Sequence, residues 1–132
     1  MYYKKRVTPL ILAMLVLLTA CSPSDTPSIN KVTASEASQM VENNNAIIID
    51  VRNQSEWDAG HIPGAIHIPL SEVKDRIPEL IVYKDRPLVM QCYSGKRSAK
   101  AAGILQQAGF DNVSNMTGGI SAWSAAKLPL EK

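Results

Sequence analysis

The sequence predicts a single α/β domain with a mainly parallel central sheet flanked by helices. At 132 residues the chain has the length of one ordinary domain. With 45% hydrophobic and 20% charged residues, its composition is that of a folded globular protein. Short apolar runs alternate with helical segments, and this order is typical of parallel sheets. In such sheets active sites lie at the carboxyl ends of the strands.

The N-terminus has the pattern of an export signal. Lys4, Lys5 and Arg6 precede an apolar run over residues 7–20, which Thr8 and Pro9 interrupt and which is shorter than a membrane-spanning helix requires. Leu18-Thr19-Ala20-Cys21 resembles the lipobox of bacterial lipoproteins, in which the cysteine is lipidated before cleavage. An uncleaved membrane anchor is the alternative. We expect a signal peptide at residues 1–20 and a lipidated tether rich in Pro and Ser at residues 21–28.

Cleavage of this signal changes the charge of the mature chain. The whole chain has 14 Lys and Arg against 12 Asp and Glu, and three of the basic residues lie in the signal. The remaining 11 against 12 leave the mature chain near neutrality, which argues against a nucleic-acid partner. A lipid on Cys21 would attach the domain to a membrane on the periplasmic side of the cell envelope. Ser22 in place of Asp resembles the default for sorting to the outer membrane.

The expected domain covers residues 29–130 and begins near Ile29. Thr33-Ala34-Ser35-Glu36 has the form of a capping box and predicts a helix to about Glu42. Residues 46–50 form a continuous β-branched run, which predicts a strand buried on both faces.

The middle of the chain is more polar. Residues 52–63 are punctuated by Gly and Pro and are interpreted as a loop, followed by a short extended segment at 65–68. Ser71 is expected to cap a helix through about Arg76, which the Ile77-Pro78 step should break.

The second half repeats the alternation of strand and helix. Residues 87–92 and 112–116 are predicted strands. Residues 98–108 are a predicted helix ending at Gly109, and residues 120–126 are the last helix.

The candidate active site is the loop Cys92-Tyr93-Ser94-Gly95-Lys96-Arg97-Ser98, between a predicted strand and a predicted helix. Sulfur chemistry needs the thiolate, and an ordinary cysteine is mostly protonated near neutral pH. Loop amides, the helix dipole and the charges of Lys96 and Arg97 all favour the anion, and Gly95 allows a tight curl. The alternative is a buried cysteine that only packs. Lipidation of Cys21 would leave Cys92 without a disulfide partner, since the chain has two cysteines.

Three separated motifs give residues 29–130 a resemblance to the rhodanese homology domain. The motifs are Ile49-Asp50-Val51-Arg52 with Glu56-Trp57, Gly60-His61-Ile62-Pro63-Gly64-Ala65 and Ile68-Pro69; the loop Cys92 to Arg97; and Gly118-Gly119-Ile120 with Trp123 and Pro129. The resemblance implies a sulfurtransferase without a cofactor. Cys92 takes a sulfur atom from thiosulfate or a related anion as a persulfide and gives it to a thiol or to cyanide.

The same resemblance implies roles around the loop. Lys96 and Arg97 would hold the anionic donor, and Ser94 and Ser98 would donate hydrogen bonds. Tyr93 either contacts the substrate or only forms a wall of the pocket. Asp50, Arg52 and Glu56 are interpreted as a structural ion-pair cluster rather than as an acid/base set. His61 is interpreted as a residue that stabilises a turn, and no metal site is expected from His61 and His67.

Three alternative functions stay open. The first is a persulfide carrier or docking module without turnover. The second is a relative of phosphatases and arsenate reductases, and the third is a thiol oxidoreductase. Those phosphatases have five residues between Cys and Arg, whereas four residues separate Cys92 from Arg97 here. An oxidoreductase would need a second cysteine to resolve a mixed disulfide.

Overall fold

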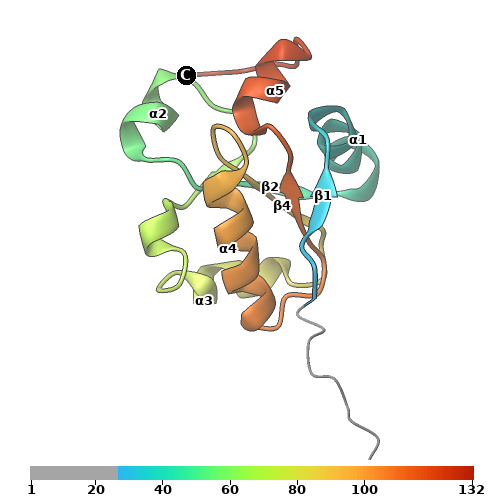
Figure 1. Cartoon of the computed structure of the whole chain (residues 1–132), viewed down its shortest axis with the longest axis vertical. Helices are drawn as coiled ribbons and strands as arrows, with labels where there is room; N and C mark the ends of the chain where they lie inside the picture. The colour runs from blue at the N-terminus through green and yellow to red at the C-terminus, as the bar shows by residue number, and fades with distance from the viewer. Residues whose placement is uncertain (1–26) are drawn as a thin grey trace, which may run out of the picture.

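The computed structural model describes residues 27–132 as an α/β fold around a five-stranded parallel sheet (Figure 1). The strands, in the sheet order β1-β5-β4-β2-β3, are β1 (Asn30–Val32), β5 (Val113–Met116), β4 (Leu88–Gln91), β2 (Ile47–Asp50) and β3 (Ile66–His67). Every pairing between these strands is parallel. The predicted fold class is therefore confirmed.

The helices are α1 (Ala34–Asn44), α2 (Gln54–Ala59), α3 (Ile77–Leu80), α4 (Lys96–Gln107) and α5 (Gly119–Ala125), with short 3-10 turns η1 (Leu70–Glu72) and η2 (Ile81–Tyr83). The expected signal peptide and lipidation site lie outside the described residues. Among residues 27–132, no helix combines the length and apolar character needed to cross a bilayer.

Both faces of the sheet are covered by helices. On one face, Ile49 and Met90 pack in a cluster that includes Leu105 of α4. On the other, Ile48 and Val89 pack in a second cluster that includes residues of α1 and α5. Successive strand residues point to opposite faces, so a continuous apolar run is buried only when both faces are covered. The run of isoleucines in β2 meets this requirement.

The capping box predicted for α1 is present. The Glu36 amide donates to Thr33 Oγ1 at 3.2 Å, and the Thr33 amide donates to Glu36 Oε2 at 2.7 Å. The helix continues two residues past the predicted end and stops at Asn45, whose φ of 56° is left-handed. Asparagine tolerates this conformation better than most residues.

The loop predicted over residues 52–63 is wrong, because α2 lies within it. Asn53 caps this helix: Asn53 Oδ1 accepts from the Glu56 amide at 3.0 Å, and Glu56 Oε2 accepts from the Asn53 amide at 3.1 Å. The segment is polar because α2 is short and none of its residues is buried.

The helix predicted from Ser71 to Arg76 is also wrong. Those residues form a 3-10 turn followed by turns, and Pro78 lies in the first turn of α3 instead of breaking a helix. Proline is accepted there because the first amides of a helix have no partner within the helix. The first strand, β1, was not predicted from its three residues, and α4 begins two residues earlier than predicted, at Lys96.

Candidate active site

Cys92 lies at the centre of the sheet's carboxyl edge. It follows β4 directly, and β4 is paired with β2 on one side and β5 on the other. Only 1% of the residue is exposed. The chain then curls through Ser94 and Gly95 into the first turn of α4. Of the predicted candidate residues, Cys92 to Gly95 therefore form the loop after the strand, and Lys96 to Ser98 form the first turn of α4.

Hydrogen-bond donors surround the sulfur of Cys92. The Gly95 amide lies 3.1 Å from Sγ, and the Ser98 hydroxyl lies 3.3 Å from it. Burial raises the pKa of the Cys92 thiol, but hydrogen bonds from the Ser98 hydroxyl and from the amides of Ser98, Gly95 and Ser94 outweigh burial and bring the pKa below its ordinary value. The loop therefore favours the thiolate.

The loop's shape depends on glycine at two positions. Gly95 has a φ of 102° and precedes α4, where a side chain would strain the curl. Gly119, at the start of α5, has a φ of 57°, and a Cβ there would collide with the carbonyl oxygens of Cys92 and Tyr93. This close approach lets the Ile120 amide donate to the Cys92 carbonyl at 2.8 Å and the Ser121 amide to that of Tyr93 at 3.2 Å. The α5 N-terminus thus holds the loop from the side opposite to α4.

Asn115 is a site residue that the sequence reasoning missed. It lies in β5 beside Met90 of β4 and is almost fully buried. Its Nδ2 donates to the Gly95 carbonyl at 3.0 Å, and its Oδ1 accepts from the Ser98 hydroxyl at 2.6 Å. Because that hydroxyl has one proton, it donates either to Asn115 or to the sulfur at a given moment. A polar residue near the end of a buried strand was the available signal.

Gln91 is a second buried polar residue beside the loop that was not singled out. Its Nε2 donates to the Cys92 carbonyl at 2.8 Å, while its Oε1 has no partner among the described residues. The carbonyl of Cys92 therefore accepts from both Gln91 and Ile120. These two hydrogen bonds hold the backbone of Cys92 in place and thereby position its side chain.

The predicted cluster of Asp50, Arg52 and Glu56 is only partly correct. Arg52 and Asp50 form a buried ion pair with Nη2 and Oδ2 at 2.7 Å, and Arg52 also donates to the carbonyls of Glu56 and Gly60. The carboxylate of Glu56 takes no part in this pair. It bonds instead to Arg97 through two contacts of 2.8 and 2.9 Å.

The ion pair with Glu56 changes the expected role of Arg97. Hydrogen bonding to Arg97 holds the pKa of Glu56 at about 2, and hydrogen bonding to Glu56 raises the pKa of Arg97. The charge of Arg97 is thus paired with that of Glu56. Lys96 is exposed and has no ion-pair partner within residues 27–132. It is the loop cation left to attract an anion.

His61 belongs to the scaffold. Its ring stacks on Trp57 at 3.7 Å between centroids, and the ring of His67 lies against Trp57 at 4.7 Å. The backbone of His61 pairs with that of Glu131 near the C-terminus, through bonds of 2.8 and 2.9 Å. These contacts agree with a turn-stabilising role.

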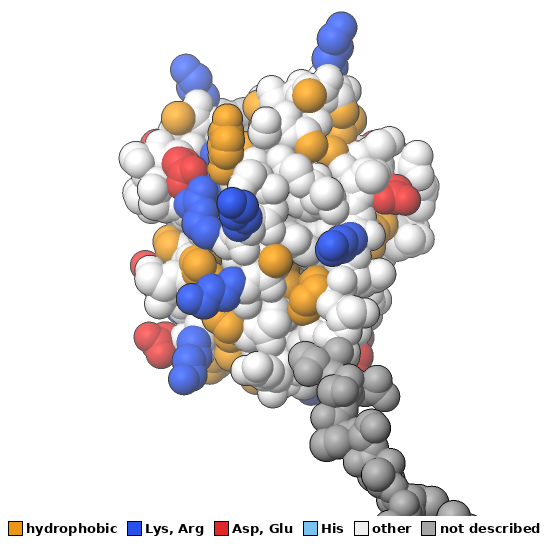
Figure 2. Space-filling view, in the orientation of Figure 1, with side chains coloured by type: hydrophobic (Ala, Val, Ile, Leu, Met, Phe, Trp, Pro, Cys, Tyr) orange, Lys and Arg blue, Asp and Glu red, His pale blue; other side chains and the backbone are white. Residues whose placement is uncertain are grey.

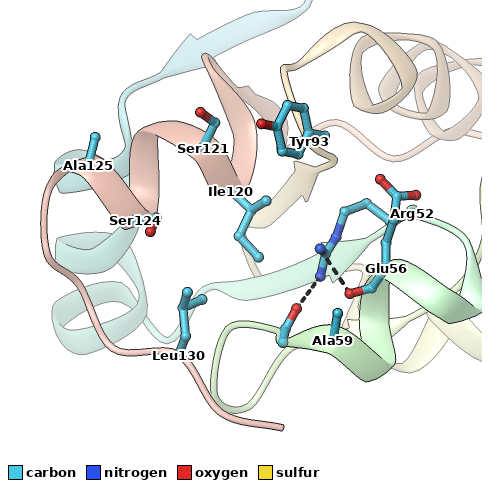
Figure 3. A pocket seen from close by; sticks show the side chains of 10 residues that line it. Arg52, Glu56, Ala59, Tyr93, Ile120, Ser121, Ser124, Ala125 and Leu130 are labelled. Carbon is cyan, nitrogen blue, oxygen red and sulfur yellow. Dashed lines mark hydrogen bonds between the residues drawn. The ribbon is translucent and has the colours of Figure 1, made fainter.

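A hollow of about 420 Å³ opens beside the loop (Figure 3). Tyr93, Ile120 and Leu130 give it an apolar lining, and Arg52 and Glu56 lie at another side. The Tyr93 residue is 57% exposed and forms part of this wall. The hollow therefore borders the loop at Tyr93.

Comparison with known proteins gives the same classification as the geometry. A family model described as "Rhodanese-like domain" matches residues 33–126. A protein of Allochromatium vinosum named sulfurtransferase is 34% identical over 103 residues, which cover 77% of this chain and 94% of that protein.

Two solved structures are similar in fold. A rhodanese-related protein from Thermoplasma volcanium has a TM-score of 0.70 at 28% identity, covering 77% of this chain and 97% of that one. A Rhodopseudomonas palustris protein of unknown function, described as a possible tyrosine phosphatase, has a TM-score of 0.72 at 30% identity, covering 79% and 86%. By its matched residues and by its fold, the chain belongs to the family of rhodanese-like domains.

Proposed function

We propose that the protein is a sulfurtransferase that moves a sulfane sulfur from thiosulfate, or a related anionic donor, to a thiol or to cyanide through a persulfide on Cys92. The observation that carries the proposal is the ring of donors around Cys92 Sγ. Amides and a hydroxyl that stabilise a thiolate stabilise a persulfide anion in the same way. The family supplies the precedent, since the Allochromatium vinosum relative is named a sulfurtransferase.

The reaction has two displacement steps. In the first, the Cys92 thiolate attacks the outer sulfur of thiosulfate, the new S–S bond forms and sulfite leaves with the electrons of the broken bond. In the second, an acceptor thiolate or cyanide attacks the outer sulfur of the persulfide, and Cys92 leaves as a thiolate. No net oxidation of the protein occurs, so no cofactor is required.

The charged residues around the loop have different roles in binding the donor. Lys96 is free to attract the dianion, and the amide of Gly95 faces the sulfur. Arg97, held by Glu56, fixes the position of α2 against the loop instead of binding the donor. Ser98 contributes its hydroxyl, whereas the Ser94 side chain is exposed, and its contribution to the pKa of Cys92 is made by its amide.

The test is turnover by the purified protein. Incubation with thiosulfate and cyanide should produce thiocyanate, and Cys92→Ser should produce none. Ser121→Ala is the matched control. It removes the exposed hydroxyl of a residue that lines the neighbouring hollow, and is therefore an equally small change near the site. Equal thiocyanate formation by the wild type and Cys92→Ser would defeat the proposal.

A persulfide carrier without turnover is the second candidate, and the deep burial of Cys92 favours it. A shielded persulfide is protected from solvent and lasts long enough to be handed to a partner. Intact-mass measurement after thiosulfate treatment separates the two. Gain of one sulfur without thiocyanate formation would assign the carrier role.

A phosphatase is less well supported than either. The loop closes over the sulfur with Gly95 amide and Ser98 hydroxyl near 3 Å, which leaves a site suited to one additional atom. With five residues between Cys and Arg, a phosphatase would have its arginine at the position of Ser98, and the neighbouring Arg97 is bonded to Glu56. Hydrolysis of p-nitrophenyl phosphate that depends on Cys92 would reverse this ranking.

We also propose that the chain is an exported lipoprotein whose lipid on Cys21 holds the domain on the periplasmic side of a membrane, with the outer membrane as its destination. The order of basic residues, apolar run and cysteine at the N-terminus supports this proposal. Incorporation of labelled palmitate in cells, abolished in Cys21→Ala, is the expected result. Equal labelling of both proteins would contradict it.

A further inference from the structure

A second hollow, of about 540 Å³, lies along α4 beside the active-site loop. Its lining includes the apolar side chains of Leu70 and Ile104, the polar side chain of Asn53, and the cations Lys74, Arg97 and Lys100. We call this hollow the cationic groove. In Figure 2, Lys and Arg side chains gather on this face of the molecule, with apolar side chains between them. Its volume is that of a pocket for a small molecule.

The charges of the cationic groove are of one sign. None of the described residues that line it is Asp or Glu. Arg97 is balanced by Glu56, but Lys74 and Lys100 have no ion-pair partner within residues 27–132. Two cations without an ion-pair partner, in one hollow with apolar side chains, complement a ligand that carries negative charges on an organic body.

The cationic groove adjoins the chemistry of Cys92. Arg97, in the first turn of α4, belongs both to the active-site loop and to the groove lining. Lys100 follows one turn later on the same side of the helix, at i+3 from Arg97. A ligand lying along this groove would therefore meet the active-site loop at Arg97, five residues after Cys92. A persulfide places its outer sulfur about 2 Å beyond Sγ.

We propose that the cationic groove binds the body of the sulfur acceptor, and that this acceptor is a small thiol carrying two or more negative charges. The inference rests on the proposed function, because it concerns the second step of that reaction. The acceptor thiolate forms an S–S bond to the outer sulfur of the Cys92 persulfide as the bond between that sulfur and Sγ breaks. Cys92 is released as a thiolate, and the acceptor leaves as an anionic persulfide.

The experiment measures the second step alone. The purified protein is loaded with thiosulfate, freed of excess donor and mixed with mercaptosuccinate, which has two carboxylates, or with 2-mercaptoethanol, which has no charge besides its thiol. Loss of the added sulfur is followed by intact mass. In the wild type, transfer to mercaptosuccinate should saturate at lower concentration than transfer to 2-mercaptoethanol.

The decisive variant is the double substitution Lys74→Ala with Lys100→Ala. It should raise the half-saturating concentration of mercaptosuccinate by about fivefold, since each exposed charge pair is worth a few-fold, and leave 2-mercaptoethanol unaffected. The matched control is Lys31→Ala with Lys132→Ala, which removes the same charge from exposed positions outside the groove. The control should behave as the wild type with both thiols.

The outcomes separate this inference from the proposed function. Normal persulfide loading with equal mercaptosuccinate dependence in the double variant and wild type would overturn the groove assignment alone. Slower loading by thiosulfate with unchanged transfer would assign the groove to the donor and also overturn it. Absence of any added sulfur in the wild type would instead reject the Cys92 chemistry on which the inference depends.

Discussion

Replacement of Glu56 by Gln tests the ion pair that joins α2 to the active-site loop. Glu56 accepts two hydrogen bonds from Arg97, and these bonds hold its pKa at about 2, against an ordinary value of 4.5. Glutamine has nearly the same size. It also serves at this position of a capping box, so the N-terminus of α2 stays capped. The substitution therefore removes the charge with little other change.

The size of the effect follows from the shift in the pKa of Glu56. A fall from 4.5 to about 2 corresponds to at most about 3.4 kcal/mol of stability near neutral pH, at about 1.36 kcal/mol per unit. The side chains of Arg97 and Glu56 are 36% and 28% exposed, so solvent screens the pair. We expect Glu56→Gln to lower the free energy of unfolding by about 1 to 2 kcal/mol at pH 7.

The pH dependence has a definite sign. The folded-state pKa of Glu56 is depressed, so its stabilisation is complete above the unfolded-state value of 4.5 and is lost as the pH falls toward about 2. Urea unfolding at several pH values between 7 and 2.5 should therefore show the wild type and Glu56→Gln converging in acid. Glu42→Gln, at an exposed glutamate of α1, is the control. Equal stabilities of wild type and Glu56→Gln at pH 7, or a difference that does not change with pH, would refute the reasoning.

Three further predictions concern the site itself. Glu56→Gln should also lower the KM for thiosulfate by about two- to fivefold, because it frees Arg97 to attract the dianion; an unchanged or higher KM in the thiocyanate assay would contradict this. Ser98→Ala removes a donor to the thiolate and should raise the pKa of Cys92, so the pH profile of its alkylation should move to higher pH, and an unmoved profile would count against the hydroxyl. Gly119→Ala should lower the free energy of unfolding by about 2 kcal/mol or more, because its Cβ meets the loop carbonyls. Gly103→Ala, in α4 with open space around it, should instead stabilise the protein by about 0.5 to 1 kcal/mol in the same urea titration, and similar effects of the two substitutions would oppose the packing argument.

The fold was predictable because its strands have a strong and local signal. The isoleucines of β2 form an uninterrupted apolar run, and a strand covered on both faces requires such a run. The α1 cap was predictable for the same reason, since Thr33 and Glu36 satisfy each other's neighbouring amides. In both cases the residues that decide the structure are adjacent in the chain.

The errors had two causes. One was competition between local signals, and the other was a structure that depends on a distant partner. Asn53-Gln54-Ser55-Glu56 has the same capping-box form as Thr33 to Glu36, but Gly60 and Pro63 nearby suggested a loop. The strand β1 has three residues and owes its place to pairing with β5, a partner more than 80 residues away in the chain. Sequence pattern alone contains little of such long-range pairing.

The candidate site was predictable as a loop and not as a network. Cys92 to Ser98 is contiguous, so its chemistry is visible in the sequence. The pair of Glu56 with Arg97 spans 41 residues, and Asn115 reaches Ser98 across 17. Both contacts exist because α2 begins, and β5 ends, at the carboxyl edge of the sheet, where the loop also lies. Only the fold brings these residues together, and they change the charge available to a substrate.

Among the expected sources of positive potential at the sulfur, the hydrogen-bond donors of the loop are in direct contact with it. From the sequence, loop amides, the helix dipole and both cations are expected to favour the thiolate; the contacts that lower the pKa of Cys92 are hydrogen bonds from the Ser98 hydroxyl and the loop amides, and Arg97 also interacts with Cys92 through its charge. These donors are fixed in place by Asn115, Gly119 and the α5 N-terminus. Dipoles that already point at the anion need not reorganise when an outer sulfur arrives or leaves. A fixed ring of dipoles thus suits the proposed reaction, in which the sulfur of Cys92 gains and loses an atom, while the pair of Arg97 with Glu56 joins α2 to α4.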